Sequence, residues 1–223
     1  MALFGWLSSL FVPRRVEVLG QTGEEAGDWG DFEPMQIWVG LGNPGAQYAM
    51  HRHNVGFMAL DAIAATHNFD PPKKAFQGWT QQGRIGSERI LLLKPATFMN
   101  DSGRAIGEAM RFFKKDIDAL TVFHDELDLA PFKVKVKTGG GTAGHNGLRS
   151  TEAHIGNAFR RVRIGIGHPG HKDRVTKHVL GNYAKAESDD LADMLGAIAA
   201  EADWLAKGDD ARFMSEVARR LQD

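Results

Sequence analysis

The chain has 223 residues, with 27 lysines and arginines, 28 aspartates and glutamates, nine histidines and no cysteine. This length and a hydrophobic content of 43% fit one large globular domain. The lack of cysteine excludes disulfides, iron–sulfur clusters, cysteine-based zinc sites and a thiol nucleophile. No apolar run reaches the roughly 20 residues that span a bilayer, so we expect a cytoplasmic protein that does not enter the membrane.

Residues 1–34 differ from the rest of the chain. They begin with the apolar stretch Met1–Val12 and contain two basic and six acidic residues, which leaves 25 basic and 22 acidic residues in 35–223. A secretory signal is not indicated, because basic residues before the apolar stretch and a cleavage motif after it are missing. We therefore predict a poorly ordered N-terminal extension over 1–34 and a domain over 35–223. As a hypothesis, translation naturally starts at Met35.

From Gln36 onwards, strand and helix patterns alternate. Buried strands are predicted over 36–41, 89–93, 120–124 and 162–166, with a hairpin partner at 79–85 and a half-exposed strand at 132–137. Helices are predicted over 55–66, from about 101 to 114, over 187–205 and over 211–221, with Asn54 as a candidate N-cap of the first. This order predicts an α/β fold, a single domain with a mixed, twisted central sheet flanked by helices.

Four polar loops follow these elements, at 42–54, 97–102, 124–128 and 139–146. Three of them come directly after buried strands. Residues just beyond strand ends of an α/β sheet gather at one edge, where such folds build their sites. We therefore expect the four loops to lie near one another.

His53 and Asp125 are the candidate general base and its partner. A general base needs a group that fixes its tautomer, and a carboxylate does this well. Water is the expected nucleophile of a hydrolase here, because Gly-x-Ser-x-Gly and cysteine are both absent. A metal site built from His51, His53 and Asp125 is an alternative, although no His-Glu-x-x-His motif supports it.

Asparagines and basic residues complete the candidate site. Asn43, Asn100 and Asn146 lie in turns, where asparagine either forms local hydrogen bonds or binds a peptide or an oxyanion. Two basic sets alternate along predicted strands and form either a solvated face or a phosphate clamp. These sets are Lys133, Lys135 and Lys137 on one strand and Arg161 and Arg163 on the other.

Five segments together resemble bacterial peptidyl-tRNA hydrolase. They are VGLGNPGAQYAMHRHNVG at 39–56, KPATFMNDSG at 94–103, HDELDL at 124–129, KVKTGGGTAGHNGL at 135–148 and RVRIGIGHPG at 161–170. The resemblance runs in order from about Met35 to the C-terminus. It implies a monomeric esterase, without metal or cofactor, whose partner is peptidyl-tRNA. The bond cleaved joins the peptide to the 3′-terminal ribose.

The resemblance also implies residue roles. His53 matches the base that activates water, Asp125 matches the carboxylate that holds it, and Asn43 matches the residue that senses the blocked amino side of the substrate. Met99 and His145 match flanking positions without a defined role. The implied contacts with substrate and tRNA are Tyr48, Phe98, Asn100 and Asn146, together with Lys137 and Arg163 for the 5′-phosphate.

Three other functions stay open at this point. An RNA-binding relative of the same fold that has lost catalysis would keep the basic residues but has no need for both His53 and Asp125. A metal hydrolase acting on phosphate esters would use the alternative metal site. A nucleotide-binding module would need a glycine fingerprint, and the loop 139–147 lacks the Gly-Lys-Ser/Thr of a P-loop.

Overall fold

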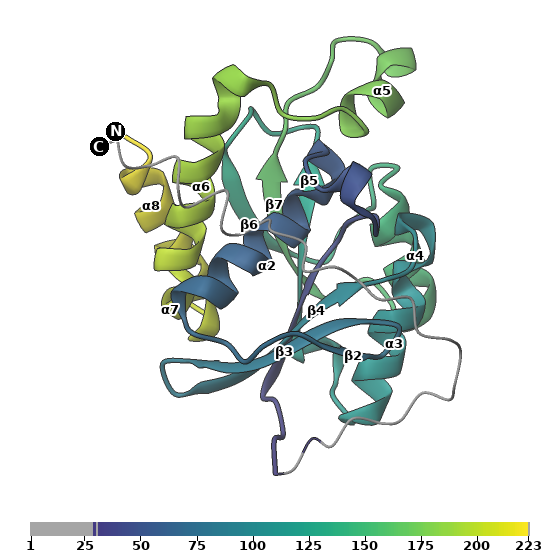
Figure 1. Cartoon of the computed structure of the whole chain (residues 1–223), viewed down its shortest axis with the longest axis vertical. Coiled ribbons are helices and arrows are strands. Elements are labelled where there is room, and N and C mark those ends of the chain that lie inside the picture. Colours follow the sequence, from purple (N-terminus) through teal and green to yellow (C-terminus); the bar gives the residue numbers. More distant parts are fainter. Residues whose placement is uncertain (1–28, 30, 223) are drawn as a thin grey trace.

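A seven-stranded mixed sheet forms the centre of the computed structural model, which describes residues 29 and 31–222 (Figure 1). The strands are β1 (Gln36–Gly40), β2 (Lys73–Ala75), β3 (Gly78–Ile85), β4 (Glu88–Pro95), β5 (Leu120–Glu126), β6 (Val134–Thr138) and β7 (Arg160–Gly165). Their order in the sheet is β2-β3-β4-β1-β5-β7-β6; the pairs among β4, β1, β5 and β7 are parallel, and the edge pairs are antiparallel. This order confirms the predicted mixed sheet.

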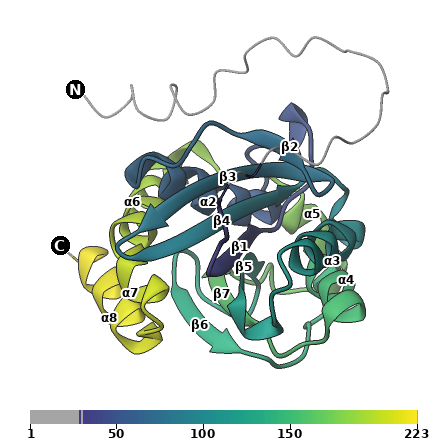
Figure 2. The ribbon, with the colours of Figure 1, turned by 90° about the horizontal axis from the view of Figure 1, so that it is seen from below.

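Helices cover both faces of the sheet (Figure 2). They are α2 (Val55–Thr66), α3 (Ser102–Phe112), α4 (Asn146–Ile155), α5 (Val175–Val179), α6 (Ser188–Ala200), α7 (Ala202–Ala206) and α8 (Asp210–Arg220). Helices α3 and α4 lie on one side, and α6, α7 and α8 lie on the other. Side chains alternate along β1 and so serve both layers: Trp38 packs in the core with α2, α6 and α8, whereas Ile37 and Val39 pack in the core with α3 and α4.

The prediction of one helix over 187–205 was wrong, because the chain breaks there into α6 and α7. Glu201 separates the two helices, and its buried carboxylate pairs with Arg220 of α8. The ion pair between Glu201 and Arg220 is a tertiary contact, and the local spacing of apolar residues does not predict such a contact.

Two glycines bring the start of α2 against the sheet. A Cβ atom on Gly40 would lie 2.4 Å from the carbonyl oxygen of Gly56, and one on Gly56 would lie 2.3 Å from that of Phe123. Only glycine permits this approach of backbone to backbone. The short 3₁₀ helix Arg52–Asn54, which precedes α2, is thereby held beside the end of β5, and these two segments carry the predicted base and its partner.

The described residues before Met35 contact the domain. Trp29 stacks on Phe76 with ring centroids 5.2 Å apart, and Glu33 pairs with Lys115 at 3.1 Å. The predicted apolar stretch 1–12 lies outside the described residues, and the boundary at residue 35 stays a prediction. Among the helices that are described, none has the length and apolar character that crossing a bilayer requires.

Candidate active site

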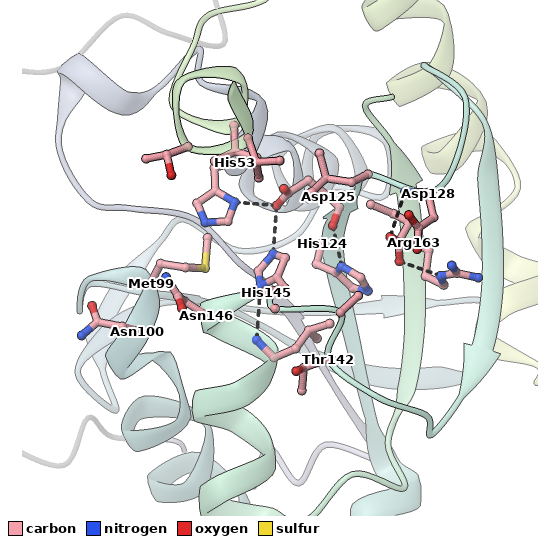
Figure 3. Close-up of a pocket in the computed structure, with 18 of the residues that line it drawn as sticks. His53, Met99, Asn100, His124, Asp125, Asp128, Thr142, His145, Asn146 and Arg163 are labelled. Atoms are coloured by element: carbon pink, nitrogen blue, oxygen red, sulfur yellow. Dashed lines mark hydrogen bonds and ion pairs between the residues drawn. The ribbon is translucent and has the colours of Figure 1, made fainter. Parts of the chain in front are cut away.

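A cavity of about 970 Å³ opens at the sheet edge where the parallel strands end (Figure 3). Residues from all four predicted loops line it, so the expectation that these loops gather is confirmed. Tyr48 lies beside the cavity, with its ring edge toward Phe98 at a centroid distance of 6.5 Å. The other residues to which the resemblance assigns a contact or a catalytic role all line it: Asn43, His53, Phe98, Asn100, Asp125, Lys137, Asn146 and Arg163. Of the further candidates, Arg161 lines the cavity, whereas His51, Lys133 and Lys135 do not.

His53 and Asp125 form a buried pair in the wall of the cavity. The Nδ1–H of His53 donates to Oδ1 of Asp125 at 2.8 Å, and Figure 3 shows the other ring nitrogen pointing away from the carboxylate. Burial lowers the pKa of His53, but the charge of Asp125 and the hydrogen bond to it outweigh burial and raise that pKa above its ordinary value. The free Nε2 is therefore a proton acceptor of enhanced basicity.

His145 is a second partner of Asp125 that the sequence did not reveal. Its Nε2 lies 2.9 Å from the same Oδ1 atom, and its ring centroid lies 4.8 Å from that of His53. Burial raises the pKa of Asp125, and the two imidazoles outweigh this effect and hold the pKa below its usual range. Asp125 is therefore the ionised centre of a three-residue cluster.

A metal ion at this cluster would compete with hydrogen bonds that its members already make. Within the described part of the chain, His53, Asp125 and His145 offer ligand atoms within 4.8 Å of one another, and His51 is not among them. The Nδ1 of His145 accepts the backbone N–H groups of Gly147 and Leu148, at 3.1 and 3.3 Å, so the ring proton is on Nε2. In this tautomer Nε2 of His145 carries a proton, so a metal ion would have to displace that proton before this nitrogen could act as a ligand.

Asn43 is held by three hydrogen bonds in the wall of the cavity. Its backbone N–H donates to Oδ1 of Asn54 and its carbonyl accepts from Nδ2 of Asn54, both at 2.9 Å. Its own Oδ1 accepts from the backbone N–H of Met99 at 2.9 Å, so the amide N–H₂ is the group left for a ligand. Asn54 does not cap α2 with its side chain, contrary to the prediction, because this side chain is used on Asn43.

Two basic side chains, Lys137 and Arg163, also line the cavity, together with the acidic Glu126 and Asp128. Lys137 is exposed, and Arg163 is partly exposed with its Nε donating to Glu126 at 2.9 Å. The antiparallel register of β6 and β7 pairs Lys135 with Arg163 and Lys137 with Arg161. These cross-strand neighbours lie on one face of the sheet, and Glu126 orients the Arg163 guanidinium there.

Arg161 does not fit the expectation of an exposed phosphate ligand. It is 3% exposed, its guanidinium lies 4.6 Å from the Phe159 ring centroid, and its Nη groups donate to the carbonyls of Gly140 and Gly141 at 2.8 Å each. The glycine-rich loop folds over this side chain and accepts from its Nη groups, while its buried Nε has no hydrogen-bond partner among the described residues. Arg161 is therefore an anchor of the loop that leads to His145.

Two asparagines and an aromatic ring lie at the rim. Phe98 and Asn100 are exposed, and Asn146 is the first residue of α4. The Oδ1 of Asn146 accepts from the Arg149 guanidinium, which leaves the amide N–H₂ of Asn146 for a ligand. All three side chains are placed to contact a molecule entering the cavity.

His124 is a buried neutral histidine beneath the site. Its Nδ1–H donates to the backbone carbonyl of Asp125 at 2.8 Å, and its ring lies edge-on to that of His145 at 5.2 Å. Its Nε2 is buried without a hydrogen-bond partner among the described residues. Burial lowers the pKa of His124 to about 3.

Comparison with known proteins identifies the family of this arrangement. A family model described as peptidyl-tRNA hydrolase matches residues 37–223. The peptidyl-tRNA hydrolase of Rhizorhabdus wittichii is 82% identical over 189 residues, which cover 85% of this chain and 100% of that protein. That of Erythrobacter litoralis is 76% identical over 188 residues, which cover 84% of this chain and 100% of that protein.

A solved structure agrees with the sequence comparison. The crystal structure of peptidyl-tRNA hydrolase from Acinetobacter baumannii superposes with a TM-score of 0.77 at 38% identity, covering 84% of this chain and 97% of that one. The family model reaches all seven strands of the sheet and the loops that line the cavity. The chain belongs to the peptidyl-tRNA hydrolase family.

Proposed function

We propose that this chain hydrolyses the ester that joins a peptide, or an N-blocked amino acid, to the 3′-terminal ribose of tRNA. The reaction returns tRNA from peptidyl-tRNA that has left stalled ribosomes. The observation that carries this proposal is the buried His53–Asp125 pair in the wall of a cavity that Lys137 and Arg163 also line. The pair supplies a base for hydrolysis, and the two basic side chains supply cations for tRNA phosphates.

His53 is the general base of the proposed reaction. Asp125 keeps the ring proton on Nδ1, so Nε2 takes a proton from water while the water oxygen bonds to the ester carbonyl carbon. The carbonyl electrons move to oxygen and form a tetrahedral intermediate. Its collapse breaks the bond to the ribose 3′-oxygen, which receives the proton from His53. General-base catalysis of this kind contributes about 10²–10⁴-fold.

Asn43 reads the blocked amino side of the substrate. Because Met99 and Asn54 fix its side chain and backbone, its amide N–H₂ has a set position in the wall of the cavity that His53 also lines. An acyl carbonyl on the substrate nitrogen can accept from this group, whereas the ammonium of a free aminoacyl-tRNA would place donor against donor. Asn100 and Asn146 at the rim, with the rings of Phe98 and Tyr48, contact the peptide and the terminal nucleotide.

Lys137 and Arg163 bind the 5′-phosphate of the tRNA. The Nε–H of Arg163 donates to Glu126. This hydrogen bond leaves the remaining guanidinium N–H groups for a ligand in the cavity, which Lys137 also lines. A terminal phosphate with extra negative charge suits such a pair of cations. Recognition of a few phosphates at one end explains how a chain of net charge −1 selects tRNA.

The test is hydrolysis of N-acetyl-aminoacyl-tRNA by the wild type and His53→Ala, each with and without EDTA. We expect EDTA to leave the turnover of the wild type unchanged. His53→Ala should lose nearly all turnover while its affinity for tRNA stays close to that of the wild type. Sensitivity to EDTA would support the metal alternative. A folded wild type that binds tRNA without turnover would indicate the silent RNA-binding relative.

We further propose that the enzyme acts as a monomer in the cytoplasm. Every residue assigned to the site comes from one chain, so a second subunit is not needed to complete it. Light scattering after size exclusion should give the mass of one chain, and turnover should be retained at nanomolar concentration.

A further inference from the structure

Two imidazole N–H groups converge on one oxygen atom of Asp125. Nδ1 of His53 and Nε2 of His145 lie 2.8 and 2.9 Å from Oδ1, which has two lone pairs and so serves both donors. The ring of His145 lies between those of His53 and His124, with centroid distances of 4.8 and 5.2 Å. The proposed base therefore shares its carboxylate partner with a second imidazole.

The backbone of α4 fixes the tautomer of His145. As the N-cap residue of α4, His145 accepts the N–H groups of Gly147 and Leu148 on Nδ1. Two donors facing one nitrogen exclude a proton there, so the proton must be on Nε2, where it points at Asp125. One side chain thus has two separable tasks: it caps a helix with one nitrogen and holds the carboxylate with the other.

We propose that His145 is a positioning residue of the hydrolase, which orients the Asp125 carboxylate and takes up part of its negative charge, so that His53 stays unprotonated as the base at neutral pH. The proposal rests on the proposed function for its catalytic meaning. Its physical basis is that a carboxylate engaged by a second N–H donor attracts a neighbouring imidazolium less strongly.

Asp125 is the neighbouring negative charge that acts on the protonation of His53. Within the described ranges, the titratable groups that face His53 are Asp125 at the end of β5, His145 just before α4 and His51 on its own segment. Asp125 is the one anion among them. A change in how that charge is shared will consequently appear in the titration of His53.

Two substitutions separate the two tasks of His145. His145→Asn places a carboxamide oxygen near the position of Nδ1 and keeps an N-cap acceptor, but its side chain is too short to reach Asp125. His145→Gln places a carboxamide N–H near the position of Nε2 and keeps the donor to Asp125, but loses the cap acceptor. Each variant is the structural control for the other.

The experiment measures the His53 titration by NMR of histidine-labelled protein, with the signal assigned by its loss in His53→Ala. The acid limb of kcat/KM and the Tm are measured alongside. For His145→Asn we expect the His53 midpoint and the acid limb to move up by at least half a pH unit, with a rate loss that shrinks above pH 8 and a nearly unchanged Tm. For His145→Gln we expect a midpoint within about 0.2 units of wild type and a lowered Tm.

A His145→Asn midpoint equal to that of wild type would overturn the proposal. So would a rate loss that is the same at every pH and follows Tm in both variants, because this pattern describes a purely structural residue. Failure of the proposed function looks different. In that case the wild type itself would not hydrolyse N-acetyl-aminoacyl-tRNA, while the NMR midpoints would still report whether His145 acts on His53.

Discussion

The two ends of the cavity are built in opposite ways. At the catalytic end, His53, Asp125 and His145 are buried or nearly so, and each hydrogen bond of the cluster has an assigned donor and acceptor. At the basic end, Lys137 is exposed and Arg163 is 26% exposed at its side chain. Proton transfer needs a fixed geometry, whereas phosphate binding tolerates mobile, solvated cations.

The two ends therefore respond to different solution conditions. Burial weakens screening, so hydrogen bonds set protonation states at the catalytic end and pH is the variable that matters there. Exposed charges are screened by salt, so ionic strength is the variable at the basic end. Changes at one end should therefore alter turnover with little effect on binding, and changes at the other should do the reverse.

The largest effect is expected from Asp125→Asn, which breaks the catalytic end without removing the base. The carboxamide N–H₂ that this substitution introduces can donate to Nδ1 of His53 and thereby move the ring proton to Nε2, which then cannot accept a proton from water. We expect kcat to fall about 10³-fold, with a Kd for tRNA within about twofold of wild type. Single-turnover hydrolysis and filter binding on the same preparations measure both.

The dependence of kcat/KM on pH shows in which direction Asp125 shifts the pKa of His53. In the wild type, Asp125 raises the pKa of His53, so kcat/KM should fall as pH drops through a midpoint above 6.5. Any residual activity of Asp125→Asn should have its midpoint at lower pH, because the raising charge is gone and burial remains. An unshifted midpoint would mean that the limb belongs to a different group.

The contact between His53 and Asp125 could be predicted from the sequence, because strand ends collect at one sheet edge and a general base needs a carboxylate to fix its tautomer. His145 could not be assigned in this way. Its role depends on α4 directing two backbone N–H groups at Nδ1, a contact between near neighbours that a turn-forming His-Asn-Gly segment does not indicate. Arg161 was misplaced for a related reason, since the glycine-rich loop folds back over a strand residue that alternation alone would expose.

A smaller effect is expected from Lys137→Ala and Arg163→Ala, which weaken the basic end. Each should raise KM about tenfold, leave kcat within about twofold, and reduce the slope of log affinity against log salt by about 0.7–0.9, the loss of one phosphate contact. Lys133→Ala is the matched control, because Lys133 is an exposed lysine just before β6 that does not line the cavity.

Substrate lacking the 5′-phosphate sharpens this prediction. The wild type should discriminate against it about tenfold, and the two variants should not discriminate, because the phosphate and its cations contribute together. Equal discrimination by wild type and Arg163→Ala would place the 5′-phosphate elsewhere.

The last prediction concerns His124, where burial at the catalytic end acts on stability instead of turnover. In the folded protein burial lowers the pKa of His124 to about 3, while in the unfolded chain it titrates near 6.5. Between these values the unfolded chain holds one more proton, so the free energy of unfolding decreases as pH falls, by about 1.4 kcal/mol per pH unit from this group.

His124→Asn keeps a side-chain N–H for the Asp125 carbonyl but does not titrate. In urea unfolding between pH 6 and 4, the slope of the free energy of unfolding against pH should therefore be smaller than in the wild type by the contribution of one proton. Parallel slopes for His124→Asn and wild type would mean that His124 is protonated in the folded protein.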